Sequence, residues 1–340
     1  MSTPMETVTA PLWGWVLLTV VKSLAVLIAL LTAFAYMTWL ERRLIARFQI
    51  RLGPNRVGPF GLLQPLADGI KLFFKEDFMP EEADKPLFLL APAISMIAAF
   101  TAFAVIPFGP TDITLWGVPL FQIANPDTGI LFVLAATSLG VYGIILGGWA
   151  STSKYPLLGA LRSSAQLISY ELAVGLAIVG VIVLSGTLKL PEIVEQQAGL
   201  WNLFVLPLGF LLLVVGATAE VNRAPFDLPE SEQELTAGYH TEYGGMKFAA
   251  FFVAEYVNLV TAASVITTLF LGGWRGPFVD QIPLLGLFWF FVKVFAFVFF
   301  FIWLRATLPR VRYDQLMDLG WKLLIPLAFV NLFVASLIAL

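Results

Sequence analysis

Long apolar stretches alternate with short polar connections along almost the whole chain. A helix needs about 20 mostly apolar residues to cross a hydrocarbon core of roughly 30 Å. Open strands would leave backbone groups unpaired in lipid, so the pattern predicts an all-α polytopic membrane protein whose single membrane domain covers residues 1–340. Eight segments have the required length and composition: Leu12–Trp39, Leu87–Phe108, Gly129–Ala150, Ala165–Gly186, Leu200–Ala219, Phe248–Gly272, Leu284–Leu304 and Leu323–Leu340.

The connection after the first span has a different pattern near residues 60–75. Apolar residues follow helical spacing there, and polar residues occupy the opposite face. The apolar positions are Leu62, Leu63, Leu66, Ile70, Phe73 and Phe74, and the polar ones are Gln64, Asp68, Lys71 and Lys75. About 15 residues cannot cross the bilayer, so we expect an amphipathic helix in the membrane interface. It either rests on lipid or forms the wall of a cavity that opens to the bilayer.

Composition supports the membrane interpretation and limits the chemistry. The chain is 59% hydrophobic and only 13% charged, whereas soluble domains carry about 25% charged residues. It has no cysteine and a single histidine, His240. Iron–sulfur clusters need thiolates, and haem or copper sites usually combine His, Cys and Met. We therefore expect no iron–sulfur cluster, haem or metal on this chain, and any electron transfer that it serves must take place on a partner or on a diffusible organic carrier.

Lysine and arginine lie mostly on one side of the predicted topology. The connections after spans one, three, five and seven hold 16 of the 20 Lys and Arg residues. Because connections on the inner side carry the excess of positive charge, we expect these connections to face the cytoplasm or matrix and both termini to face outward. The 16 are Arg42, Arg43, Arg47, Arg51, Arg56, Lys71, Lys75, Lys85, Lys154, Arg162, Arg223, Lys247, Arg305, Arg310, Arg312 and Lys322.

A few ionisable residues lie within or at the ends of the apolar spans. Each such charge costs at least ~2.5–3.5 kcal/mol on insertion scales. Glu171 follows Tyr170 in span four, Glu220 ends span five, Glu255 lies in span six and Lys293 lies near the middle of span seven. They either hold the bundle together through interhelical pairs or form a functional path. For Lys22, in span one, we expect a structural role with its stem reaching the interface.

The fifth connection, residues 220–247, is strongly acidic. Its carboxylates greatly outnumber Arg223 and Lys247, and prolines and glycines divide it into turns. Crowded carboxylates in a semi-buried site raise one another's proton affinity, so we hypothesise that the cluster changes its proton count when a charge arrives nearby. A solvated acidic face is the alternative. The carboxylates are Glu220, Asp227, Glu230, Glu232, Glu234 and Glu242.

Five long motifs resemble one family, the quinone-chamber membrane subunit of respiratory complex I (the H subunit, which is subunit one of the mitochondrial set). They are WLERRLIARFQIRLGPNRVGPFGLLQPLADGIKLFFKED, GWASTSKYPLLGALRSSAQLISYE, AEVNRAPFDLPESEQELTAGYHTEY, FFVAEYVN and RATLPRVRYDQLMDLGWK, in the family's order from about Trp39 to Lys322.

The resemblance implies a function in a larger assembly. The chain would be a subunit without redox centres in a proton-translocating NADH:quinone oxidoreductase, inactive alone, in an energy-transducing membrane such as the bacterial plasma membrane. Quinone would be its substrate, entering from the bilayer between span one, the amphipathic helix and span six. Its partners would be the cluster-bearing and quinone-site subunits of the peripheral arm, which bear the flavin and clusters, and small membrane subunits leading to the antiporter-like ones.

The resemblance also assigns residues, by position in the matching motifs. The quinone chamber would involve Glu41, Arg42, Asp68, Phe252, Arg223, Arg305 and Arg310. The coupling path would involve Tyr170, Glu171, Glu220, Asp227, Glu230, Glu232, Glu234 and Glu255, to which we add the intramembrane Lys293. No residue would be directly catalytic and none would bind a metal.

Three other functions fit part of the sequence. A stand-alone proton-coupled transporter fits the intramembrane charges, but transporters usually show two related halves, which we do not find. A structural anchor fits the basic first connection but has no need of Glu171 or Glu255. A membrane subunit of a hydrogenase, or of another complex linked to ferredoxin or deazaflavin, shares some of the motifs, and the chain does not specify the electron donor.

Overall fold

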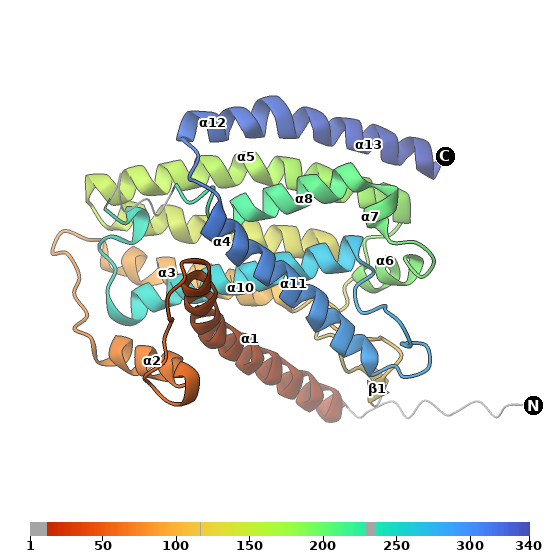
Figure 1. The fold of residues 1–340 in the computed structure, drawn as a ribbon, viewed down its shortest axis with the longest axis horizontal. Helices are drawn as coiled ribbons and strands as arrows, with labels where there is room; N and C mark the ends of the chain where they lie inside the picture. The colour runs from red at the N-terminus through yellow and green to blue at the C-terminus, as the bar shows by residue number, and fades with distance from the viewer. Residues whose placement is uncertain (1–11, 116, 229–235) are drawn as a thin grey trace, which may run out of the picture.

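The computed structural model describes residues 12–115, 117–228 and 236–340 (Figure 1). Most of the described chain is helical, and its strands form one short antiparallel pair, β1 (Thr114–Leu115) with β2 (Val118–Pro119), which confirms the all-α fold class. The helices are α1 (Leu12–Phe48), α2 (Gln64–Phe74), α3 (Lys85–Phe103), α4 (Gly129–Ala150), α5 (Lys154–Ser185), α6 (Leu190–Gln196), α7 (Asn202–Val205), α8 (Pro207–Glu220), α10 (Gly245–Phe270), α11 (Leu285–Thr307), α12 (Tyr313–Asp318) and α13 (Ile325–Ala339), with short turns η1 (Pro59–Gly61) and η2 (Gly238–His240) and a π-helical segment η3 (Leu319–Leu324) that joins α12 to α13.

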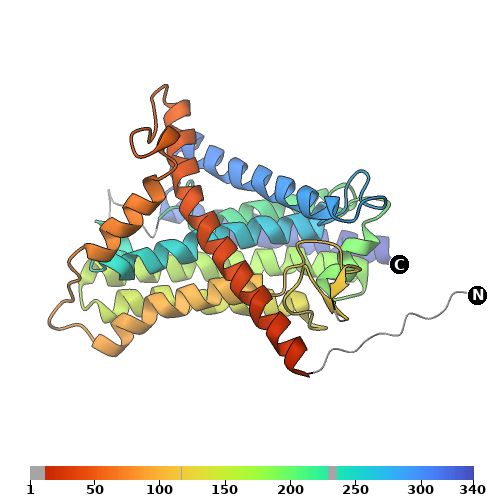
Figure 2. The same cartoon turned by 90° about the horizontal axis from the view of Figure 1, so that it is seen from below.

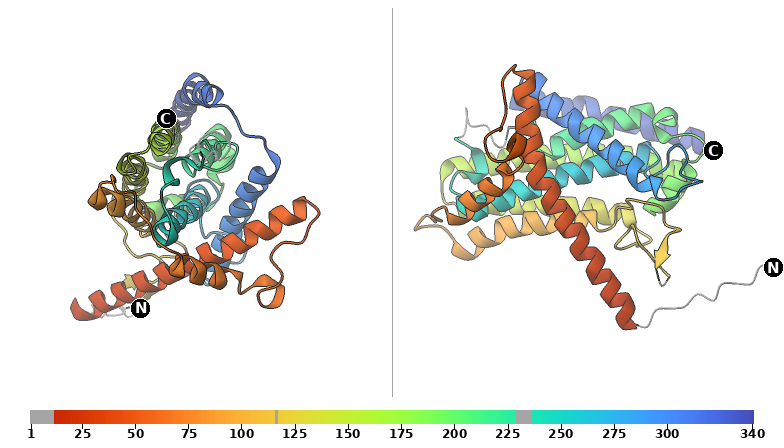
Figure 3. Two further views of the ribbon diagram at one scale, coloured as in Figure 1. Left: turned by 90° about the vertical axis from the view of Figure 1, so that its left-hand side faces the viewer. Right: turned by 60° about the horizontal axis from the view of Figure 1, so that its bottom comes forward.

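Seven helices in the described part of the chain are long and apolar enough to cross a membrane: α1, α3, α4, α5, α10, α11 and the continuous run from α12 to α13. Figures 1 and 2 show that α3, α4, α5, α8 and α10 run roughly alongside one another, while α1 and α11 cross them obliquely. Seen nearly end-on, α1 lies across one side of the bundle (Figure 3, left). The chain is thus an all-helical membrane protein with two slanted helices beside a bundle.

The segment expected as the fifth span is divided in the structure. Over Leu200–Ala219 we expected one helix, but α7 ends at Val205 and α8 begins at Pro207, with Leu206 in a non-helical conformation between them (φ −126°, ψ 65°). Pro207 lacks an N–H and disfavours helical geometry in the residue before it. At 1.5 Å per residue, the 14 residues of α8 are about 21 Å long, which is shorter than the roughly 30 Å core.

Two helices extend beyond the apolar stretches that suggested them. The first continues past Trp39 to Phe48, so Glu41 and Arg42 stand on its last turns. The fourth long helix, α5, begins at Lys154 and therefore includes the polar stretch before Glu171. Hydropathy marks only the apolar part of a helix, whereas the backbone hydrogen bonds continue through polar residues. These extensions hold the charged side chains on rigid helices.

The amphipathic segment forms α2, which packs against α1 and α10. Four of its apolar side chains remain largely exposed: Leu66, Ile70, Phe73 and Phe74. An apolar face left uncovered on a helix at the side of the bundle is suited to lipid or to a partner. Its position in the membrane interface stays a prediction.

Small residues draw the helices of the bundle together. A Cβ on Gly143 of α4 would lie 2.0 Å from the Ser95 Oγ of α3, and one on Gly148 would lie 2.3 Å from the Cβ of Ala160 in α5. Such close approach is the usual way in which helices associate where lipid removes the hydrophobic drive. It brings α3, α4 and α5 close enough to enclose polar groups between them and α10.

Candidate functional site

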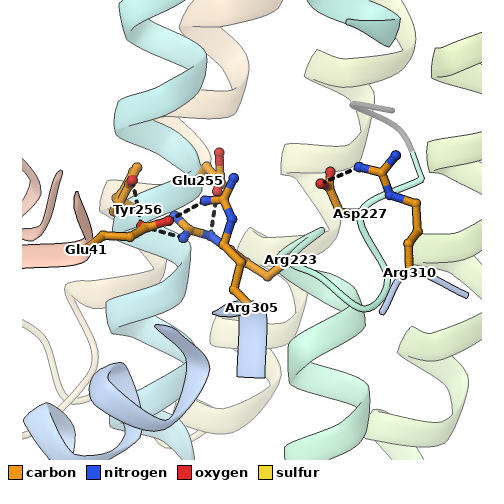
Figure 4. A network of polar contacts seen from close by, with 7 residues as sticks. All are labelled: Glu41, Arg223, Asp227, Glu255, Tyr256, Arg305 and Arg310. Carbon is orange, nitrogen blue, oxygen red and sulfur yellow. Dashed lines mark hydrogen bonds and ion pairs between the residues drawn. The ribbon is translucent and has the colours of Figure 1, made fainter. Parts of the chain in front are cut away.

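A buried cluster of charges joins four separate parts of the chain (Figure 4). Arg223, in the turn after α8, donates from Nη1 to Glu41 Oε2 of α1 at 2.6 Å. Its Nε lies 2.7 Å from Glu255 Oε1 of α10, an ion-pair contact without hydrogen-bond alignment. Arg305, on the last turn of α11, pairs with the other oxygen of Glu41, and Tyr256 donates to Glu41 Oε2 at 2.8 Å. Two arginines and two glutamates thus balance one another.

Gln166 of α5 holds the turn that aims Arg223 inward. Its Nε2 lies 2.9 Å from the carbonyl oxygen of Ala219 and 2.8 Å from that of Phe226. It also contacts Asn222 Oδ1 at 3.3 Å. Asn222 has φ 56°, a left-handed conformation that asparagine tolerates better than most residues. The chain therefore reverses sharply after α8 and directs the next side chain into the bundle.

Arg223 is a fixed charge. It is 2% exposed and its guanidinium lies 4.4 Å from the ring centroid of Tyr256. Burial by itself would lower the pKa of Arg223, but the carboxylates of Glu255 and Glu41 outweigh burial and raise that pKa well above its usual value. Removing either partner of a buried ion pair leaves an uncompensated charge and destabilises strongly. Changes of charge in this cluster must therefore fall on its carboxylates.

Asp227 and Arg310 form a second pair beside this cluster (Figure 4). Arg310 donates from Nη2 to Asp227 Oδ2 at 2.9 Å, while Asp227 Oδ1 is buried and has no hydrogen-bond partner among the described residues. Burial raises the pKa of Asp227 above its usual value, and Arg310 counteracts only part of that rise. The pair ties the loop after α8 to the segment after α11.

A polar cavity of about 50 Å³ lies between α3, α4, α5, α8 and α10. The carboxylates of Glu171, Glu220 and Glu255 line it, together with Asn258 and Ser138. Ser138 hydrogen-bonds to Glu171. One buried water needs roughly 10–15 Å³ and two to four polar partners, so the cavity can hold about three waters between the carboxylates. Glu255 belongs both to this cavity and to the arginine cluster, and it is the residue that connects them.

Three of the expected chamber residues, Arg42, Asp68 and Phe252, lie outside the arginine cluster. Arg42 Nη1 donates to Asp68 Oδ2 at 2.6 Å and so joins α1 to α2. Phe252 of α10 lies in a cluster of rings, with its centroid 4.5 Å from that of Phe248 in a tilted arrangement and 6.2 Å from that of His240 edge to face. Burial lowers the pKa of His240 to about 4, so the ring is neutral.

A separate apolar groove of about 420 Å³ lies on the other flank of α1, between α1, α10 and α11. Aromatic side chains line it, among them Tyr36, Trp39 and Phe291. The first helix therefore has the α2 side on one flank and an aromatic groove on the other.

Several expected residues lie away from the carboxylate series. Tyr170 points to α12, where its hydroxyl donates to the carbonyl oxygen of Leu316 at 2.9 Å. Lys293 is buried against backbone carbonyls at the end of α10, 2.6–3.0 Å away, rather than against the carboxylates. Glu230, Glu232 and Glu234 lie outside the described residues.

Some polar residues of the site carried no clear signal in the sequence. Ser138, Asn222 and Gln166 contribute to the cavity or to the turn, but hydroxyl and amide side chains are common in membrane helices. Only the density of polar residues in the α5 segment pointed to Gln166. Within the described ranges, no group of three His, Asp or Glu side chains is placed to hold a metal ion.

Comparison with known proteins gives a consistent result over nearly the whole chain. Residues 21–336 match the family described as NADH dehydrogenase. A Geobacter metallireducens protein, named as an H subunit of NADH-quinone oxidoreductase, is 55% identical over 317 residues, which are 93% of this chain and 94% of that protein. Proteins named as the same H subunit from Protochlamydia amoebophila and Deinococcus deserti are 54% and 56% identical, covering 90% and 95% of this chain and 92% and 84% of their own lengths.

Proposed function

The chain belongs to the NADH dehydrogenase family, and from that premise we propose that it is the H subunit, in the membrane arm, of a proton-translocating NADH-quinone oxidoreductase. In this proposal it forms part of the quinone chamber, couples quinone reduction to proton movement, and docks the arm that holds the redox centres. The observation that carries the coupling is that Glu255 faces both Arg223 and the polar cavity.

The proposed chemistry needs no redox group on this chain. Reducing one quinone to quinol consumes two electrons and two protons. The electrons come from clusters on partner subunits, and quinone is the substrate that this chain guides. Its own residues contribute fixed charges, exchangeable protons and a path through the bilayer interior.

Coupling would run through the arginine cluster. When quinone reduction withdraws protons or places a charged species near Glu41, the balance of two arginines and two carboxylates changes. Arg223 forms ion pairs with both Glu41 and Glu255. When its ion pair with one carboxylate weakens, its ion pair with the other becomes stronger. Glu255 would then release or take up a proton through the cavity toward Glu220 and Glu171, where waters would bridge the carboxylates.

The chamber and its mouth would use the side of α1 that faces α2. Quinone would enter from the bilayer between α1, α2 and α10. Phe252 would supply an aromatic surface for the ring or tail, and the Arg42–Asp68 pair would fix the distance between α1 and α2. The acidic connection, with Asp227, Glu230, Glu232 and Glu234, would lie beside the chamber, and Arg305 and Arg310 would help to anchor it.

The docking of the peripheral arm and the orientation of the chain in the membrane are proposed from the uneven distribution of Lys and Arg between the two sides. The basic connection after α1 would face the cytoplasm and receive the peripheral arm, and both termini would lie on the outer side of a bacterial plasma membrane. Small membrane subunits would lead from this chain to the antiporter-like subunits.

The test is to solubilise native membranes gently, retrieve the chain through a C-terminal tag and assay quinone reduction with NADH. We expect a large assembly with flavin and iron–sulfur clusters and with inhibitor-sensitive NADH:quinone activity. Recovery of the chain alone would favour a stand-alone transporter. Recovery with clusters but without response to NADH would identify a related complex with another electron donor.

A further inference from the structure

The C-terminal end of α10 has its backbone carbonyls capped by side chains from other helices. The last carbonyls of a helix have no partners within the helix, and an unpaired carbonyl is costly in a membrane. Gln197, just after α6, donates to the carbonyl oxygen of Thr268 at 3.0 Å, and Asn202 of α7 donates to that of Leu269 at 2.8 Å. These two amide side chains provide hydrogen-bond donors for two of the carbonyls at the end of α10.

Lys293 of α11 donates hydrogen bonds to the backbone carbonyls in the turn that follows α10. Its ammonium lies 2.7, 3.0 and 2.6 Å from the carbonyl oxygens of Leu271, Gly273 and Arg275. A lysine ammonium has three donors and no acceptor, so every N–H of the group is used. A neutral amine has two N–H groups and would leave one of these carbonyls unpaired.

The turn after α10 is built to bring these three oxygens together. Gly272 and Gly273 have φ values of 68° and 49°, in the left-handed region that favours glycine. A Cβ on Gly273 would lie 2.6 Å from Val194 Cγ2, and one on Gly272 would lie 3.1 Å from Trp201 Nε1. Conformation favours glycine at both positions, and at Gly273 the lack of space also excludes a side chain.

An aromatic face completes the site. The Lys293 ammonium lies 4.8 Å from the ring centroid of Trp201, within the range of a cation–π interaction. The side chain of Lys293 is buried, and among the described residues no carboxylate forms an ion pair with it. Its partners are backbone dipoles and a ring, which together form the environment in which carbonyl-lined sites hold potassium or ammonium.

We propose that α10 ends in a monovalent-cation site made of three carbonyls and the Trp201 face, and that Lys293 is the tethered cation that fills it. The cation also opposes the negative end of the α10 dipole. Lys293 is thereby a positioning residue: it fixes the end of α10 against α11, and α10 carries Glu255 and Tyr256 toward its other end. This role needs a permanent charge and no proton exchange, which separates Lys293 from the carboxylates of the coupling path.

The site can be tested by removing the tethered cation and supplying free ones. The variant Lys293→Ala is extracted as the full chain in its native assembly, in potassium, ammonium, sodium or choline chloride at equal ionic strength. The readout is the temperature at which half of the tagged chain is lost from the soluble fraction. We expect a clear drop for Lys293→Ala in choline, recovery of at least half of that drop in potassium and in ammonium, and no dependence on the salt for the wild type.

Lys247→Ala is the matched control, because Lys247 pairs with the carboxylate of Asp77 at 3.0 Å and its removal leaves no carbonyl cage. It should respond equally to all four salts. Equal stability of Lys293→Ala in every salt, or no loss in choline, would overturn the proposal.

Potassium tests whether a monovalent charge alone is sufficient, because it has no N–H groups to donate to the carbonyls. Recovery by ammonium alone would also overturn the proposal and would show that the three carbonyls require hydrogen-bond donors. These stability readouts do not depend on quinone reduction, so a failure here is distinguishable from a failure of the proposed function.

Discussion

Arg223 and Glu255 join the turn after α8 to the middle of α10 through a buried ion pair whose Nε and Oε1 atoms lie 2.7 Å apart. The same guanidinium reaches Glu41 on α1 at 2.6 Å. Three elements that are remote in sequence thus depend on one side chain. Arg223 is a fixed positive charge between two carboxylates. When one carboxylate takes up a proton, its attraction to Arg223 weakens, and the guanidinium stabilises the negative charge of the other carboxylate more strongly. The protonation of one carboxylate therefore depends on that of the other.

Replacing Arg223 with methionine should destabilise the protein by about 3–5 kcal/mol, the usual consequence of removing one partner from a buried pair. Methionine preserves much of the volume, so the loss reflects the two carboxylates left without their cation. The measurement is thermal loss of the full chain from detergent-solubilised membranes.

Arg312→Met provides the control for that change. Arg312 pairs with Asp314 at 2.9 Å, but both side chains are largely exposed, and exposed pairs contribute about 0–1 kcal/mol. Arg223→Met and Arg312→Met with equal stability would show that the cluster around Glu41 does not hold the helices together.

The sequence sufficed for the helical fold because apolar length is a local property. The sequence could not show that Pro207 divides the fifth segment into α7 and α8, because the residues on both sides of the break at Leu206 are equally apolar. Glu255 could be singled out as a charge inside a predicted span, whereas Glu41 and Arg223 were assigned only through the resemblance to the family's motifs. Arg223 and Glu41 pair although they are 182 residues apart, and nothing in the spacing of a single sequence specifies which charge meets which.

The same limit applies to Lys293. Sequence alone placed an ammonium in a span, and the coupling path was a natural assignment because three other intramembrane charges, Glu171, Glu220 and Glu255, are acidic. Its carbonyl partners depend on the conformation of Gly272 and Gly273, which only the three-dimensional structure shows. Backbone acceptors carry no residue signature, so a lysine that binds them is indistinguishable in sequence from one that binds a carboxylate.

His240 should make the protein less stable at acidic pH. Its folded pKa is about 4, against an ordinary value of 6.5, because it is buried beside Tyr239, Phe248 and Phe252. Between these values the unfolded chain binds a proton that the folded chain does not, so its contribution is complete above pH 6.5 and is lost as the pH falls toward 4. The full difference is about 3 kcal/mol at 1.36 kcal/mol per pKa unit.

His240→Phe should remove that dependence, because phenylalanine fits among the rings and does not titrate. The measurement is the melting temperature of both proteins at several values between pH 4 and pH 7. The variant should lose less stability than the wild type on acidification, and identical slopes would mean that His240 is not buried as a neutral ring.

The mouth of the proposed chamber can be located by kinetics. Arg42→Ala removes the contact of 2.6 Å with Asp68, and Phe252→Ala removes a ring beside His240. Both should raise the apparent Michaelis constant for quinone in the intact complex while changing the maximal rate less, because they act on access and not on electron delivery.

Phe291→Ala is the matched control for Phe252→Ala, because Phe291 lines the aromatic groove on the opposite flank of α1. It should leave the Michaelis constant unchanged. The reverse result, with Phe291→Ala raising it and Phe252→Ala having no effect, would move the quinone path to the groove between α1, α10 and α11.

Glu220→Gln should uncouple proton movement from quinone reduction while leaving the assembly intact. Glutamine keeps the size of the side chain in the cavity that it shares with Glu171 and Glu255, but it cannot release a proton. Positioned proton-transfer groups contribute roughly 10²–10⁴-fold to rate, so a coupling path through Glu220 should lose nearly all of its proton flux. The measurement compares proton uptake into native vesicles with quinone reduction in the same sample, and gel filtration checks assembly.

Glu195→Gln is the control, because it alters an exposed carboxylate of α6, and it should retain full coupling. If Glu220→Gln also pumped at the wild-type ratio of protons to electrons, protons would have to leave Glu255 by a route that avoids Glu220, and the cavity would serve only to hydrate the buried charges.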